Sequence, residues 1–130
     1  QKLNSDFAVP VLANAAMMRF YSQRLDEDLP GRYVIFGHIG DAHVHVNILP
    51  ETEQDAASGR ALMIEFARKA VELGGTVSAE HGLGRKKRDL LGIEFDPTQI
   101  EAMKAVKRQL DPAWLLGQGV LFDPEAGCRR

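Results

Sequence analysis

The four histidines of the sequence are distributed unevenly. His38, His43 and His45 fall within eight residues, and His81 directly follows Glu80. Neutral imidazoles and carboxylates are ligands that zinc and manganese take in proteins. If a tight turn joins two strands here, the rings of His38 and His45 meet at one point and Glu80 supplies a third ligand. Three protein ligands leave coordination positions open for a substrate, as in a catalytic site.

The residue types alone leave a structural role open for each of these histidines. A histidine in a strand is more often hydrogen-bonded within the fold than bound to a metal, and the sequence contains neither a CxxC nor an HExxH spacing. A non-catalytic α+β module that binds a metal or another ligand therefore remains an alternative.

Two predicted strands carry the clustered histidines. Residues 32–36 are rich in β-branched and aromatic side chains, and a glycine-rich turn over 37–42 leads to a second strand over 43–49. Side chains alternate between the two faces of a strand. Alternation in the second strand separates an apolar row (Val44, Val46, Ile48) from a row on the opposite face (His43, His45, Asn47, Leu49).

Helical periodicity predicts three helices around these strands. The first follows Pro10 and ends near Asp28, and the second extends over 55–73. The third begins after the N-cap Asp96 and ends near Leu110. The expected buried stripes are Leu12, Ala16 and Phe20; Leu62, Met63, Phe66, Ala70 and Leu73; and Ile100, Met103, Val106 and Leu110. A short strand over 76–79 completes an α+β fold, a mainly antiparallel sheet with helices on one face, such as a ferredoxin-like cap or substrate domain.

Composition narrows the class of protein. The 130 residues fit one domain, 45% of them are hydrophobic and 26% charged, and the net charge of -2 argues against nucleic acid as a partner. The single cysteine, Cys128, excludes an intrachain disulfide. With neither a signal peptide nor an apolar run of about 20 residues, we expect a cytoplasmic protein. The sequence starts at Gln1 without an initiator methionine, and we expect it to be a piece of a longer chain.

Four motifs, in order along the chain, resemble one family. Residues 36–48, FGHIGDAHVHVNI, resemble the G-H-x-G-D-G-N-x-H-x-N-x signature in the C-terminal region of FAD-linked oxidases of the vanillyl-alcohol-oxidase type. Residues 6–10 (DFAVP) resemble its D-x-x-V-P, residues 78–87 (SAEHGLGRKK) its G-E-H-G-x-G-x-x-K, and residues 107–112 (KRQLDP) its K-x-x-x-D-P. The family includes D-lactate, D-2-hydroxyglutarate and glycolate dehydrogenases.

The resemblance implies a flavin-dependent 2-hydroxy-acid dehydrogenase. The chain is then its C-terminal substrate or cap domain (1–130), with 111–130 as a tail that returns to a missing FAD-binding domain. His38, His45 and Glu80 are expected to bind zinc or manganese. Asn47 and His81 face the substrate, with His81 as the catalytic base. The implied partners are a small 2-hydroxy acid, the FAD-binding domain, an electron acceptor and a second copy of the chain, at the inner face of the membrane for the full-length enzyme.

The sequence also departs from the family pattern. Ala42 and His43 replace a Gly-Asn pair, which adds a third imidazole on the face of His45 and allows a different ligand set or substrate preference. Residues 117–120 (GQGV) stand where many members have N-P-G-K. The basic residues 85–87 either form a solvated helix face or attract an anionic substrate. We assign Arg85 a minor contact with the substrate.

A histidine-triad nucleotide hydrolase is a further alternative. Residues 43–47 (HVHVN) are similar to the H-x-H-x-H strand of that class. The third histidine of that motif is the nucleophile, and Asn47 cannot form the covalent intermediate that the chemistry requires.

Overall fold

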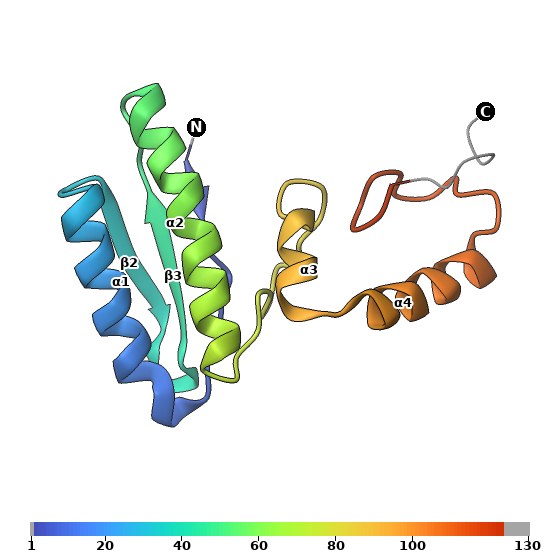
Figure 1. Ribbon diagram of the computed structural model, residues 1–130, viewed down its shortest axis with the longest axis horizontal. Helices are drawn as coiled ribbons and strands as arrows, with labels where there is room; N and C mark the ends of the chain where they lie inside the picture. Colours follow the sequence, from blue (N-terminus) through green and yellow to red (C-terminus); the bar gives the residue numbers. More distant parts are fainter. Residues whose placement is uncertain (1, 124–130) are drawn as a thin grey trace. The chain divides into compact units, whose positions relative to one another are not determined.

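The computed structural model describes residues 2–123 and divides the chain into two compact units, Gln1–Gly82 and Leu83–Arg130 (Figure 1). The first unit holds the sheet and the two long helices. The second holds two further helices, and each unit is described by itself below. Among the described residues, no helix is both long and apolar enough to cross a membrane.

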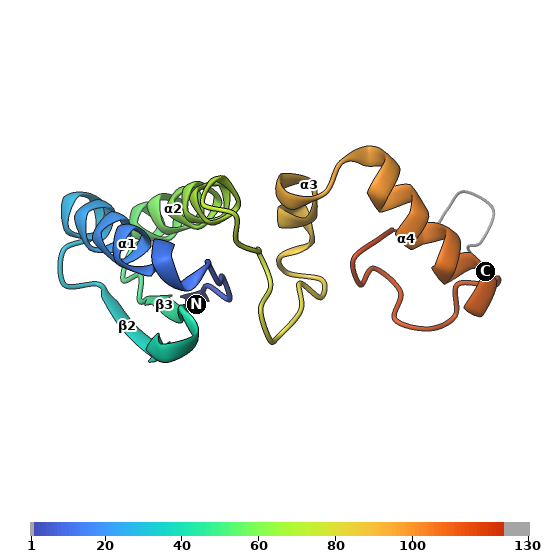
Figure 2. The ribbon, with the colours of Figure 1, turned by 90° about the horizontal axis from the view of Figure 1, so that it is seen from below.

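The first unit is an α+β layer. Its antiparallel sheet has the order β1-β3-β2, with β1 at Leu3–Asn4, β2 at Tyr33–His38 and β3 at His43–Ile48. Helices α1 (Asn14–Asp28) and α2 (Glu53–Glu72) lie side by side over one face of this sheet (Figure 2). This arrangement confirms the predicted α+β fold with helices on one face.

The core of the first unit lies between this sheet and its helices. Val46 and Ile48 of β3 are fully buried, and Tyr21 of α1 meets Phe66 of α2 edge to face, with ring centroids 4.8 Å apart. Burial of each such side chain stabilises the fold by roughly 1.5–3 kcal/mol. The apolar row predicted for the second strand therefore faces the helices, which leaves the opposite row facing away from them.

The buried stripe of α1 differs from the predicted one. Leu12 is 98% exposed, and the buried residues of α1 are Met17, Tyr21 and Leu25. The difference arises because Val11–Ala13 form a separate 3-10 turn before the α-helix begins at Asn14. The stripe of α2 follows the prediction more closely, with Leu62, Phe66 and Ala70 buried.

Local capping explains the ends of α2. The hydroxyl of Thr52 accepts a hydrogen bond from the backbone N–H of Asp55, and the Asp55 carboxylate accepts one from the backbone N–H of Thr52. This capping box satisfies N–H groups that the first helical turn leaves unpaired, so the helix starts at Glu53, before the predicted residue 55. Gly74, with φ +80°, then ends the helix in the left-handed conformation that favours glycine.

The N-terminal segment forms strand pairings that the sequence did not indicate. β1 pairs with β3 through Leu3↔Ile48 and Asn4↔Asn47. Ala8 then forms isolated bridges to both His43 and Thr76. The predicted strand over 76–79 is reduced to this one bridge, followed by a hydrogen bond from the backbone N–H of Ala79 to the carbonyl oxygen of Asp6. Gly75, immediately before the bridge, lies so close to the Ala8 carbonyl oxygen that no Cβ would fit there.

The second unit contains a 3-10 turn (Arg88–Leu90), α3 (Leu91–Glu94) and α4 (Pro97–Leu110). The predicted N-cap of α4 is confirmed, since the Asp96 carboxylate accepts from the backbone N–H of Gln99 at 2.9 Å. Its predicted buried stripe is wrong within the described residues, where Val106 and Leu110 are exposed. With only four residues, α3 is roughly 6 Å long and cannot cover the roughly 21 Å of α4.

The K-x-x-x-D-P motif forms a turn that ends α4. The Asp111 carboxylate accepts hydrogen bonds from the backbone N–H groups of Leu115 and Leu116 and from the Lys107 ammonium group. Trp114, buried within this turn, is 5.6 Å from the same ammonium nitrogen. This part of the predicted tail (111–130) therefore has a structural role within the second unit. Cys128 and the rest of the tail, 124–130, lie outside the described residues.

Candidate functional site

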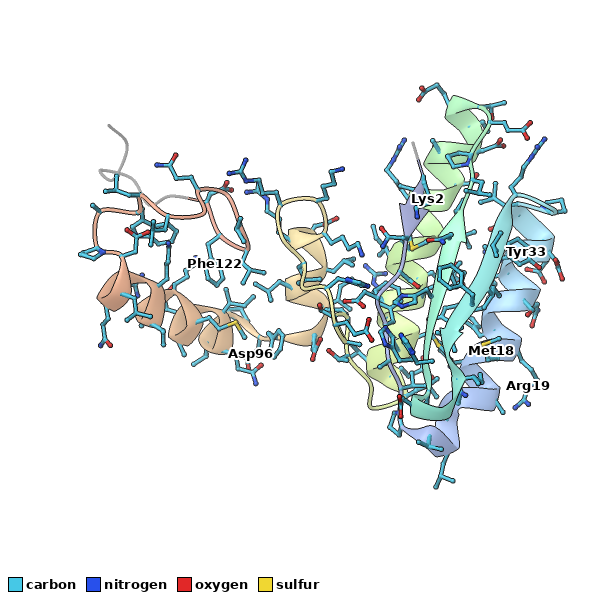
Figure 3. All side chains as sticks on the ribbon, turned by 180° about the vertical axis from the view of Figure 1, so that it is seen from behind. Lys2, Met18, Arg19, Tyr33, Asp96 and Phe122 are labelled. Atoms are coloured by element: carbon cyan, nitrogen blue, oxygen red, sulfur yellow. The ribbon has the colours of Figure 1, made fainter. Side chains whose placement is uncertain are left out.

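The site lies on the face of the sheet that the helices leave uncovered. Directly opposite residues in antiparallel strands share a face, and the register pairs Phe36 with His45 and His38 with His43. Figure 3 presents this side of the sheet, with α1 and α2 behind it. His43, His45 and Asn47 of the predicted row therefore lie on the face away from the helices, and β2 adds the His38 ring to them; Leu49, the last residue of that row, follows the end of β3.

All four histidines surround the carboxylate of Glu80. Its Oε1 is 3.3 Å from Nε2 of His38 and 3.5 Å from Nδ1 of His43. Its Oε2 is 4.0 Å from Nε2 of His45 and 3.6 Å from Nε2 of His81. The Glu80 side chain is 44% exposed and that of His81 is 59% exposed. The Glu80 and His81 side chains of this cluster are therefore open to solvent, whereas His43 and His45 are buried.

The backbone fixes the orientation of the His45 ring. Nδ1 of His45 is 3.2 Å from the carbonyl oxygen of Ser5. A carbonyl oxygen only accepts hydrogen bonds, so Nδ1 is the donor of this contact and Nε2 is the ring nitrogen that faces Glu80. Metal-binding histidines usually have such a partner on the second ring nitrogen. Ser5 is itself held in place, because its hydroxyl accepts from the backbone N–H of Val46 at 2.8 Å.

A buried carboxylate that sequence reasoning missed holds the loop that carries Glu80 and His81. Asp6 has no exposed surface, and its Oδ2 accepts from the backbone N–H of His81 at 2.8 Å and from the Ser78 hydroxyl at 3.1 Å. The backbone N–H of Glu80 reaches both oxygens, and Nε2 of His43 is 3.2 Å from Oδ1. The only sequence signal was the acidic residue that opens the D-x-x-V-P motif.

The environment keeps Asp6 ionised. Burial alone would raise the pKa of this carboxyl, but the hydrogen bonds from the backbone of His81 and Glu80 and from the Ser78 hydroxyl outweigh burial and hold its pKa below the usual range. An ionised carboxylate accepts several hydrogen bonds and donates none. Asp6 is therefore a fixed acceptor that holds the loop from Ser78 to His81 in place.

Three sets of side chains in the described residues have ligand atoms within 4.8 Å of one another. They are His38, His45 and Glu80; Asp6, His43 and Glu80; and Asp6, His45 and His81. The oxygens of Asp6 already accept several hydrogen bonds, so the two sets that include Asp6 would sacrifice those bonds. The first set is the one predicted from the sequence, and two imidazoles with a carboxylate form a donor set that fits zinc or manganese.

The other two predicted residues are in different surroundings. Asn47 is partly buried on β3, two positions beyond His45 on the same face, and is paired with both Asn4 and Val34. Arg85 is exposed and belongs to the second unit. The structure thus brings His38, His45, Glu80 and His81 together, with Asn47 on the same face of the sheet.

The fold and this cluster agree with the family comparison. The chain belongs to the family described as FAD linked oxidases, C-terminal domain, which matches residues 1–121. This assignment rules out the histidine-triad alternative.

Individual relatives support the same family assignment. An uncharacterized FAD-linked oxidoreductase of Mycobacterium tuberculosis is 36% identical over 119 residues, 90% of this chain and 25% of that protein. D-2-hydroxyglutarate dehydrogenase of Stutzerimonas stutzeri is 35% identical over 123 residues, 91% of this chain and 26% of that protein. Glycolate oxidase subunit GlcD of Bacillus subtilis is 34% identical over 108 residues, 78% of this chain and 23% of that protein. The chain therefore spans about a quarter of the length of these curated relatives.

Proposed function

We propose that this chain forms the substrate side of a flavin-dependent dehydrogenase that oxidises a 2-hydroxy acid to a 2-keto acid. The observation that carries the proposal is the Glu80 carboxylate, with nitrogens of His38, His45 and His81 within 4.0 Å of its oxygens on an open sheet face. The family assignment supports FAD as the redox cofactor. Among the relatives, the names D-2-hydroxyglutarate dehydrogenase and D-lactate dehydrogenase support a hydroxy acid as the substrate.

In this proposal His38, His45 and Glu80 hold a divalent metal ion. When bound, such an ion supplies Lewis acidity, which lowers the pKa of a substrate hydroxyl. The contact with the Ser5 carbonyl holds the His45 ring with Nε2 directed toward Glu80. The hydrogen bonds of Asp6 keep the backbone of Glu80 fixed. The metal-binding side chains therefore need little reorganisation before substrate binds.

His81 accepts the proton of the substrate hydroxyl. Imidazole is the side chain that most often serves as a general base, and that of His81 is exposed on the side of Glu80 Oε2. The backbone N–H of His81 is bound to Asp6, so the ring turns about a fixed main chain. Asn47, with an amide on the same face, orients the carboxylate of the substrate.

When bound, FAD would supply the redox chemistry of the reaction, as the acceptor of the hydride from C2 of the substrate, with a separate electron acceptor as its oxidant. The matched family is described as the C-terminal domain of FAD linked oxidases. We therefore assign flavin binding mainly to another domain, to which this chain presents the substrate.

Metal analysis tests the first part of this proposal. His38→Ala, His45→Ala and Glu80→Ala are each expected to lower the content of bound metal, while Glu53→Ala, an exposed carboxylate in the first turn of α2, is expected to leave it unchanged. Wild-type metal content in all three site variants would remove the metal assignment.

Turnover by the flavin-loaded holoenzyme tests the second part. With FAD bound, it is expected to reduce an artificial electron acceptor in the presence of D-lactate, glycolate, D-2-hydroxyglutarate or a larger 2-hydroxy acid. Failure to oxidise any member of a panel that includes aryl and alkyl 2-hydroxy acids would overturn the proposed reaction. A protein that binds metal at this site but oxidises none of them would be a non-catalytic metal-binding module.

A further inference from the structure

Two apolar side chains of β2 are exposed beside the histidine cluster. Val34 is 48% exposed and Phe36 is 52% exposed. The register pairs Val34 with Asn47 and Phe36 with His45, so both side chains lie on the open face of the sheet. Single exposed apolar residues are common, whereas an apolar patch bordered by polar residues is typical of a binding surface. The proposed function gives neither residue a role.

The two flanks of β3 differ in what they place beside His45. The segment that contains β1 and Asp6 runs along one flank, and β2 runs along the other. On the first flank, Asp6 holds the backbone of Glu80 and His81. On the second flank, the Phe36 ring is the neighbour of the His45 ring, with centroids 5.6 Å apart. A ligand above His45 therefore has the proposed base toward β1 and an aromatic ring toward β2.

The four groups on C2 of a 2-hydroxy acid can be matched to these surroundings. In the proposed function the hydroxyl group faces His81 and the carboxylate faces Asn47. The strands offer no hydride acceptor, so the hydrogen on C2 faces away from the sheet. The remaining group, the substrate side chain, is left with the β2 flank, where Val34 and Phe36 are exposed.

The strands offer no lysine or arginine to a second acidic group on the substrate. None is present in Leu3–Asn4, Tyr33–His38 or His43–Ile48. A distal carboxylate placed over Val34 and Phe36 would lose contact with water and gain no counter-charge from these strands, which costs free energy. An alkyl or aryl group in the same place removes apolar surface from water, which is favourable.

We propose that Val34 and Phe36 form the contact surface for the substrate side chain, and that the substrate is a 2-hydroxy acid with an apolar alkyl or aryl side chain. This proposal rests on the proposed oxidation of a 2-hydroxy acid and narrows its substrate class. D-2-hydroxyvalerate and D-2-hydroxyglutarate are the matched pair that tests it, because both have five carbon atoms and differ in a terminal methyl or carboxylate group.

The first experiment compares these two acids in the flavin-loaded holoenzyme. The value of kcat/KM is expected to be at least about 10-fold higher for D-2-hydroxyvalerate, because only its side chain gains from contact with an apolar surface. An equal or reversed preference would overturn the proposal.

The second experiment lengthens the apolar side chain one carbon at a time. From D-lactate to D-2-hydroxyhexanoate, each added CH₂ group is expected to raise kcat/KM about 3- to 4-fold. Phe36→Ala is expected to reduce this increment to less than about 2-fold, because it removes the ring that the side chain covers. Leu12→Ala, a 98% exposed apolar residue outside the sheet, is the matched control and should keep the wild-type increment. If Phe36 only supports the His45 ring, Phe36→Ala lowers kcat/KM for all acids by the same factor, and that result would overturn the proposal.

Binding of the corresponding 2-keto acids gives a readout that does not depend on turnover. Calorimetry of the holoenzyme should show affinity that rises with chain length and an increasingly negative heat-capacity change, both much reduced in Phe36→Ala. Wild-type increments in this variant would overturn the contact. Turnover of none of the hydroxy acids would overturn the proposed reaction and this proposal with it, whereas turnover that does not depend on chain length would overturn this proposal alone.

Discussion

The carboxylate of Asp6 accepts a hydrogen bond of 2.8 Å from the backbone N–H of His81, a residue 75 positions further along the chain. The same carboxylate binds the backbone N–H of Glu80. One buried side chain therefore sets the main-chain position of both the proposed metal-binding carboxylate and the proposed base. This relationship makes Asp6 the group on which the geometry of the site most depends.

Asp6→Asn is expected to destabilise the first unit. The NH₂ group of asparagine would face N–H and O–H donors, and Ser78 or the His81 backbone would lose its acceptor. Buried donors left unsatisfied cost about 3 kcal/mol in total, which urea unfolding measures directly. Asp41→Asn, at an exposed position of the 3-10 turn between β2 and β3, is the matched control and should change the free energy of unfolding by less than about 0.5 kcal/mol. An equal effect of the two variants would contradict the role given to Asp6.

The same carboxylate predicts a dependence of stability on pH. The pKa of Asp6 is lower in the folded chain than its ordinary value, so its ionised form favours the folded state. This stabilisation is complete above the unfolded pKa of about 3.9 and is lost as pH falls through the lower, folded pKa. In metal-free buffer, the difference in free energy of unfolding between wild type and Asp6→Asn should therefore shrink as pH falls below about 4. A difference that stays constant between pH 6 and pH 3 would count against an ionised Asp6.

The residues that could be placed from the sequence are those governed by local rules. Alternation in β3 correctly separated Val44 and Val46 from His43 and His45, because the side chains of a strand alternate whatever the strand pairs with. The N-cap at Asp96 was correct for the same reason, since its hydrogen bond reaches only three residues ahead. The convergence of His38 and His45 followed from one hairpin turn.

What could not be predicted depends on contacts between distant segments. The pairing of Leu3 with Ile48 and the bridge from Ala8 to Thr76 have no local signal, because each strand segment is too short to show periodicity. The role of Asp6 in holding the loop was missed for the same reason, since its partners in that loop lie 72 to 75 positions away. The exposed stripe of α4 was predicted as buried because periodicity shows which residues share a face and not whether anything covers that face.

Gly75→Ala is expected to disrupt the bridge that begins this loop. A Cβ at position 75 would overlap the carbonyl oxygen of Ala8 and lie 2.9 Å from that of Ala70, and backbone cannot move aside cheaply. We expect a loss of about 3 kcal/mol in the free energy of unfolding and weaker metal binding, because the displaced segment leads to Glu80. Gly40→Ala is the matched control, since an added Cβ there meets no atom within 4 Å. Equal unfolding midpoints of the two variants in urea would show that residue 75 does not constrain the loop.

Asn47→Ala should impair catalysis without impairing metal binding. If the amide orients the carboxylate of the substrate, its loss removes a hydrogen bond to a charged group, worth about 1.5–3 kcal/mol. The expected fall in kcat/KM is therefore about 10- to 150-fold, with metal affinity and thermal stability close to wild type. Gln54→Ala, an exposed amide at the start of α2, is the control. Wild-type kcat/KM for Asn47→Ala would remove this residue from the substrate site.

Metal binding should itself stabilise the fold, because the proposed ligands come from β2, β3 and the loop after residue 76, which converge only in the folded chain. An ion that binds only the folded chain adds about 2.7 kcal/mol at a concentration 100 times its dissociation constant. Thermal unfolding of the chain should therefore move to higher temperature with added Zn²⁺ or Mn²⁺ and return to its starting value with a chelator. Glu80→Gln keeps the size and exposure of the side chain but removes its charge, so its unfolding temperature should respond far less to either ion. A shift in Glu80→Gln as large as in wild type would place the ion elsewhere on the protein.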